Sequence, residues 1–76
     1  MNLYNIIIEV NAEYSYFQNF KIKAISTDIA LELLKQYFTE NFPSIEYEID
    51  EIEVDTSEEM NGDLPEILEI SGKSFF

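Results

Sequence analysis

The chain has no cysteine, histidine, arginine or tryptophan, and only two glycines and two prolines among its 76 residues. Without cysteine and histidine it has no disulfide, no thiolate nucleophile, no imidazole general base and none of the usual zinc ligands. It also lacks a glycine-rich phosphate loop and any nucleophile motif. We therefore expect a protein that is not an enzyme, with no catalytic residue, no metal site and no cofactor.

Long apolar runs are also missing. No stretch approaches the roughly 20 apolar residues that a membrane span needs, and no cationic segment followed by an apolar one opens the chain. We expect a soluble, cytoplasmic protein that has no membrane partner.

What the chain does have is material for a core and a large excess of acid. Hydrophobic residues make up 46% of the sequence and aromatic residues 14%, which is too many for a disordered chain. The length predicts one small acidic domain over residues 1–76, and a chain this short buries only about 60% of its unfolded surface.

The net charge of −12 is unevenly distributed along the chain. Residues 1–45 hold five acids and three lysines, a net charge of −2, whereas residues 46–76 hold eleven acids and one lysine, a net charge of −10. Such a chain is repelled by nucleic acid and by anionic membranes, so we expect no direct contact with either. Its expected partner is a basic protein surface.

Two strands and a helix are predicted in the first half. Residues 3–10 and roughly 16–25 alternate apolar and polar side chains, which favours an antiparallel hairpin with Lys21 and Lys23 pointing outward. Ser26-Thr27-Asp28 then predicts a helix start, and Pro43 prevents the helix from continuing far beyond Asn41. The apolar stripe expected on this helix comprises Ala30, Leu33, Leu34, Tyr37 and Phe38.

The stretch EYEIDEIEVD, residues 46–55, predicts a third strand with an irregularity. Apolar and acidic residues alternate up to Asp50, and the alternation then slips by one residue at Glu51. A β-bulge at Asp50-Glu51 restores the alternation, because the extra residue returns the following side chains to the same face. All six carboxylates then point outward. The side chains expected to be buried beneath the helix are Ile45, Tyr47, Ile49, Ile52 and Val54.

The last part of the chain is ambiguous. Residues 56–63 predict a polar loop with a turn at Asn61-Gly62. Over residues 63–72 the apolar side chains do not alternate cleanly, and Pro65 and Gly72 fit the two ends of a short helix, so a helix is preferred to a fourth strand. The predicted fold is α+β: a small antiparallel sheet in the order β-β-α-β, one amphipathic helix on one face, then a short C-terminal helix or fourth strand.

The acidic strand is the strongest functional signal. Carboxylates two residues apart on a strand are separated by roughly 6.6 Å, and neighbouring phosphates along one DNA strand, spaced about 3.4 Å along the axis, lie at a similar distance through space. The row therefore predicts a nucleic-acid mimic that inhibits a nucleic-acid-binding protein, whereas the alternative is a solvated face that aids solubility or blocks edge pairing. The expected partner-binding residues are Glu46, Glu48, Asp50, Glu51, Glu53, Asp55, Glu58, Glu59 and Asp63.

In these respects the chain resembles a class of small acidic inhibitors that phages and mobile elements direct against host nucleic-acid machinery, the anti-CRISPR and anti-restriction proteins. The likeness is carried by EYEIDEIEVD with the following TSEEMNGD, and by the strand-to-capped-helix passage KIKAISTDIALELL. It implies a phage-encoded protein that acts in the host cytoplasm. It is a likeness of class and assigns a role to no individual residue.

A second class of function is an interaction or assembly module. The chain has more aromatic residues than a 76-residue core obviously needs, among them Tyr14, Tyr16, Phe17, Phe75 and Phe76. Taken singly, each of these is expected in the core rather than at an interface. Together with exposed strand edges they predict a homodimer contact, in which case the acidic face is merely solvated.

Overall fold

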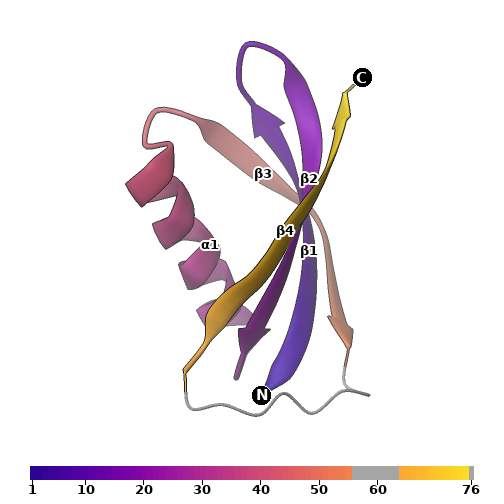
Figure 1. The fold of residues 1–76 in the computed structure, drawn as a ribbon, viewed down its shortest axis with the longest axis vertical. Helices are drawn as coiled ribbons and strands as arrows, with labels where there is room; N and C mark the ends of the chain where they lie inside the picture. Colours follow the sequence, from indigo (N-terminus) through magenta and orange to yellow (C-terminus); the bar gives the residue numbers. More distant parts are fainter. Residues whose placement is uncertain (56–63, 76) are drawn as a thin grey trace.

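The computed structural model describes the backbone of residues 1–55 and 64–75, and the side chains of residues 1–55 and 64–72. Its elements are β1 (Asn2–Asn11), β2 (Ser15–Ala24), α1 (Thr27–Asn41), β3 (Glu46–Asp55) and β4 (Glu66–Phe75). The strands form an antiparallel sheet of order β3-β1-β2-β4, and α1 covers one face of it (Figure 1). The predicted α+β fold, with a helix packed on a small antiparallel sheet, is confirmed.

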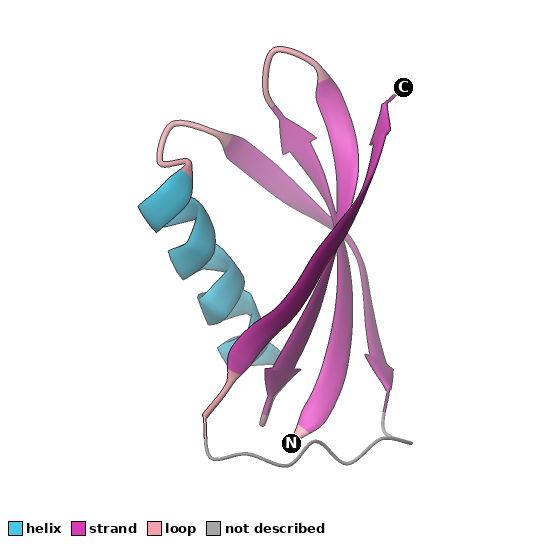
Figure 2. Cartoon of the chain, in the orientation of Figure 1, coloured by secondary structure: helices cyan, strands magenta, loops and turns pink. Residues whose placement is uncertain are grey.

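The β1–β2 hairpin forms the middle of the sheet and supplies most of the core. Ile6 pairs with Phe20 and Tyr4 with Ile22, and these side chains, predicted to point inward, are buried together. Helix α1 covers one face of the hairpin (Figure 2). Burial of this face is the main stabilising contribution available to so short a chain. The buried cluster comprises Tyr4, Ile6, Ile8, Val10, Phe20, Ile22, Ala24, Ala30, Leu34 and Phe38.

Helix α1 begins and ends as predicted. The Ser26 side-chain oxygen accepts a hydrogen bond from the Ile29 backbone N–H at 3.3 Å, so one of the unpaired donors of the first turn is satisfied. The helix ends at Asn41, and Pro43 follows two residues later. Ring stacking then connects the end of the helix to the start of β3, since the Phe38 and Tyr47 ring centroids lie 4.5 Å apart.

Lys21 and Lys23 both lie on the face opposite α1, as predicted, but Lys23 is not solvated. It is only 7% exposed and its cross-strand neighbour Leu3 only 8%. The long aliphatic part of a lysine packs well beside such a neighbour while the ammonium group reaches a polar partner. Here that partner is Glu66, whose Oε1 lies 3.4 Å from the Lys23 Nζ.

The preferred helix over residues 63–72 is wrong, because residues 66–75 form strand β4 at the edge beside β2. The irregular apolar spacing has another cause. Ile22 pairs with Ile67 and Lys21 with Glu69, so Leu68 is an extra residue that returns Ile67 and Ile70 to the face covered by α1. Gly72 does not end a helix either. Gly72 lies in a second irregularity of the same strand, and its φ of 72° is a conformation that glycine adopts without strain.

Strand β3 contains the predicted bulge. Ile7 of β1 pairs with Glu51 and the next residue, Ile8, pairs with Ile49, so Asp50 is the extra residue. The expected burial beneath the helix is only partly correct, however. Ile45 and Tyr47 pack against the core, whereas Ile49, Ile52 and Val54 remain 40%, 37% and 41% exposed.

The position of β3 in the sheet explains this exposure. Strand β3 is an edge strand, and the backbone of α1 approaches β2 and β4 instead. The helix contacts β3 near its beginning, through Phe38 and Tyr47. The rest of β3 extends beyond the area that the helix covers (Figure 1).

Candidate functional site

The acidic side chains of β3 share the face opposite α1. For five of the six this follows from the register, because their partners on β1 are the outward residues Asn11, Glu9, Ile7, Asn5 and Leu3; Asp50 is the extra residue of the bulge and has no partner on β1. We call the row the β3 carboxylates: Glu46, Glu48, Asp50, Glu51, Glu53 and Asp55. The bulge keeps the second half of the row on the same face as the first half.

The structure brings together six of the nine predicted binding residues. Five of the β3 carboxylates are exposed, and Asp55, at the end of the strand, is half-buried. The other predicted residues, Glu58, Glu59 and Asp63, lie outside the described part of the chain, as does the predicted turn at Asn61-Gly62.

Glu9 was not among the predicted residues, and it belongs to the same surface. It pairs directly with Glu48 across the β1–β3 ladder, and side chains in that relation have Cβ atoms about 4.5–5.5 Å apart. The sequence placed Glu9 on the outer face of its strand, but only the pairing of β1 with β3 brings the two carboxylates together. A pair of like charges in this position destabilises a sheet.

The two described lysines of the sheet, Lys21 and Lys23, form ion pairs away from this row. Lys21 Nζ lies 3.4 Å from a Glu69 carboxylate oxygen, and Lys23 forms the contact with Glu66 described above, so both lysines pair with β4 at the opposite edge. Among the described side chains no ion pair or hydrogen bond reaches Glu46, Glu48, Asp50, Glu51 or Glu53.

This arrangement has an energetic cost. Two unit charges roughly 6.6 Å apart repel each other by about 0.6 kcal/mol in bulk water, and by more where low-dielectric protein lies beside them. Several such pairs follow one another along β3, and the Glu9–Glu48 pair adds to them. A cationic surface that docks on the row relieves this repulsion as well as forming new attractive contacts.

The other face of the same strand is apolar. We call Ile49, Ile52 and Val54 the apolar strip; together they follow β3 on the side where α1 lies but does not cover them. Strand β3 therefore presents carboxylates on one face, apolar side chains on the other and, between them, a backbone edge that no described strand pairs with.

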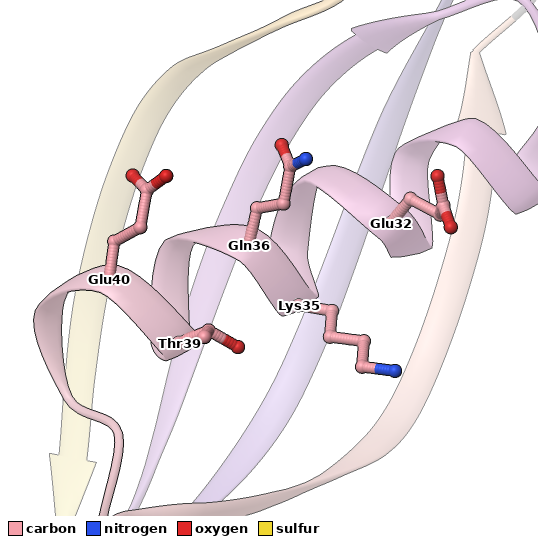
Figure 3. A pocket seen from close by; sticks show the side chains of 5 residues that line it. All are labelled: Glu32, Lys35, Gln36, Thr39 and Glu40. Atoms are coloured by element: carbon pink, nitrogen blue, oxygen red, sulfur yellow. The ribbon is translucent and has the colours of Figure 1, made fainter.

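Another surface feature is a hollow on α1 (Figure 3). Its lining comprises Glu32, Lys35, Gln36, Thr39 and Glu40. These residues recur every three or four positions, so they share one stripe of the helix, and all are exposed. The hollow contains charges of both signs, unlike the β3 carboxylates.

The described part of the chain contains neither a metal-binding cluster nor a helix that could span a membrane. No group of three or more histidine, cysteine, aspartate or glutamate side chains there is arranged to hold a metal ion. No helix of that part of the chain has the length and apolar character needed to cross a bilayer.

Comparison with known proteins found no match: no family model, no curated protein and no solved structure resembles this chain significantly.

Proposed function

We propose that this chain is a non-enzymatic binding protein that occupies the basic, nucleic-acid-binding surface of a larger protein and inhibits it as a nucleic-acid mimic. One observation carries the proposal: five of the six β3 carboxylates are exposed on one face of an edge strand, while the described lysines of the sheet pair elsewhere. A strand held in a sheet loses little conformational entropy on binding, so the row is already ordered for a partner.

The class resemblance gives this proposal its biological setting. Inhibitors that phages and mobile elements direct against host nucleic-acid machinery act in the host cytoplasm, and we propose the same setting here. The partner is then a nucleic-acid-binding protein or complex of the host.

The test compares two variants of equal net charge. The edge variant carries Glu48→Gln, Glu51→Gln and Glu53→Gln on β3. Each substitution keeps the shape of the side chain and removes one charge. An exposed ion pair contributes about 0 to 1 kcal/mol, so three together weaken binding about tenfold, mainly by slowing association.

The control variant carries Glu13→Gln, Glu32→Gln and Glu40→Gln, which are exposed positions on the β1–β2 turn and on α1. The parent, the edge variant and the control variant are each immobilised and exposed to the fraction of a bacterial lysate that binds DNA-cellulose. Retained proteins are then assayed for binding to labelled duplex DNA in competition with each variant. The parent and the control are expected to displace the DNA equally well, and the edge variant about tenfold less well. Equal displacement by the edge variant, or no retained protein, refutes the proposal.

A homodimeric assembly module is the second candidate, and the exposed apolar strip favours it. Light scattering coupled to size-exclusion chromatography distinguishes a monomer from a dimer directly. If the chain is a dimer that an apolar-strip substitution dissociates, the acidic face is a solvated surface of that assembly.

A further inference from the structure

The outer edge of β3 offers backbone hydrogen-bonding groups. Strand β3 pairs with β1 on one side only, so along residues 46–54 the N–H and C=O groups that point away from β1 have no partner strand in the described structure. An unpaired edge of this kind is a template for a further strand. A strand of ten residues is long for an edge.

The part of β3 after the bulge is regular and has two chemically different faces. Residues 51–55 pair with β1 without interruption. Glu51 and Glu53 lie on the face opposite α1, and Ile52 and Val54, 37% and 41% exposed, lie on the other. A strand added here therefore has one row of side chains beside carboxylates and the other row beside uncovered apolar groups.

A second copy of the same edge does not complement it. Pairing β3 with β3 opposes glutamate rows, and like charges directly opposite each other destabilise a sheet. The same repulsion protects the edge from open-ended aggregation. A strand whose outward side chains are cationic turns each of these repulsions into an attraction, so the charge of the edge selects its occupant.

We propose that β3 recognises its partner by strand addition. An extended segment that alternates lysine or arginine with apolar residues pairs along residues 51–54. Its cations then lie beside Glu51 and Glu53, and its apolar side chains pack beside Ile52 and Val54. The inference rests on the proposed function, because it specifies the form that the basic surface of the partner takes.

Three probe peptides test it, all seven residues long, capped at both ends and containing four lysines and three valines. The first alternates lysine and valine. The second has the same sequence but is N-methylated at two adjacent central residues, which removes one donor from each edge of the strand. The third has its lysines in one block and its valines in another. All three carry the same charge, so they differ only in the features that strand addition requires.

Binding is followed by NMR on the isotope-labelled protein, together with amide hydrogen exchange. The alternating peptide is expected to bind, to slow the exchange of outward β3 amides and to exceed both other peptides by about tenfold in affinity. Equal binding of the three peptides overturns strand addition but leaves the proposed function intact, because charge alone then attracts the partner. Suppose that no peptide binds, but a protein of the DNA-binding fraction does and its binding depends on Glu48, Glu51 and Glu53. A folded basic surface is then the partner, and strand addition is again wrong. If neither a peptide nor a protein of that fraction binds, both proposals fail.

A pair of protein variants tests the apolar half of the edge. Ile52→Thr removes part of the strip without changing the charge, and Ile29→Thr, at an equally exposed position on α1, is the matched control, since both residues are 37% exposed. Ile52→Thr is expected to weaken binding of the alternating peptide about fivefold with its salt dependence unchanged, and Ile29→Thr to have no effect. An unaltered affinity of Ile52→Thr overturns the inference. If the β3 amides exchange slowly without peptide, and more slowly as the protein concentration rises, a second copy of the chain occupies the edge. This result also overturns the inference.

Discussion

Two isoleucines that face each other across the β1–β3 ladder provide a direct test of how far the helix covers the sheet. Ile8 pairs with Ile49 on the same face, but Ile8 is fully buried whereas Ile49 is 40% exposed. Alanine substitution removes the same three carbons at each position. The two substitutions should therefore lower the free energy of unfolding by amounts that differ only because the two side chains are buried to different extents.

The magnitudes follow from these exposures. Three fully buried carbons contribute about 2.4 kcal/mol by transfer, and the cavity left in a core brings the loss for Ile8→Ala to about 3–4 kcal/mol. At Ile49 about 60% of the side chain is buried and solvent enters the space it leaves, so we expect a loss of about 1.4 kcal/mol and no cavity contribution. The difference is about 2 kcal/mol.

The assay is urea unfolding followed by far-UV circular dichroism, at two protein concentrations. A domain of this size has a total stability of about 4–11 kcal/mol, so Ile8→Ala could leave too little folded protein to measure. The milder Ile8→Val and Ile49→Val pair then preserves the comparison. Equal losses at the two positions would refute the idea that β3 is uncovered, and a loss at Ile49 that grows with protein concentration would mean that another copy covers it.

The remaining predictions concern charge and pH. Added salt between about 10 mM and 0.5 M should raise the melting temperature by screening the acidic repulsion, and the edge variant should respond less than the control variant; an indifferent melting temperature would show that the carboxylates are compensated. Burial raises the pKa of Tyr47 above its ordinary value of 10.0, so the folded state holds this proton more tightly than the unfolded chain does. Stability linked to Tyr47 is thus fully present below pH 10 and falls as pH rises through the folded pKa. The midpoint of urea unfolding, followed as the pH rises, should show this loss in the parent and not in Tyr47→Phe.

The relation between the acidic face and the free edge matters for function. Charge on an edge strand commonly serves to block pairing with other chains. On β3 the acidic row accompanies an exposed apolar strip on the same strand, so the charge excludes an acidic strand and a second copy but favours a cationic one. In the proposed function, this single feature would both protect the protein from self-association and select a basic partner.

Features that depend on neighbours along the chain could be predicted from the sequence. The hairpin, the capped helix from Thr27 to Asn41 and the bulge at Asp50 all leave a local signature, because side-chain periodicity and capping residues act over a few positions. The outward direction of the β3 carboxylates followed in the same way. The preference for a helix over residues 63–72 failed because an extra residue at Leu68 breaks the alternation by which a strand is recognised.

What only the tertiary structure decided is which strands lie side by side and how much of the sheet one helix covers. The order β3-β1-β2-β4 puts β3 at an edge, brings Glu9 opposite Glu48, directs Lys23 to Glu66 and leaves Ile52 and Val54 exposed. The pattern EIEV is the same whether a strand is central or at an edge, since periodicity specifies which face a side chain occupies and not what covers that face. Pairing and coverage depend on contacts between segments far apart in the chain, and these determine whether an acidic strand is a solvated surface or an open binding edge.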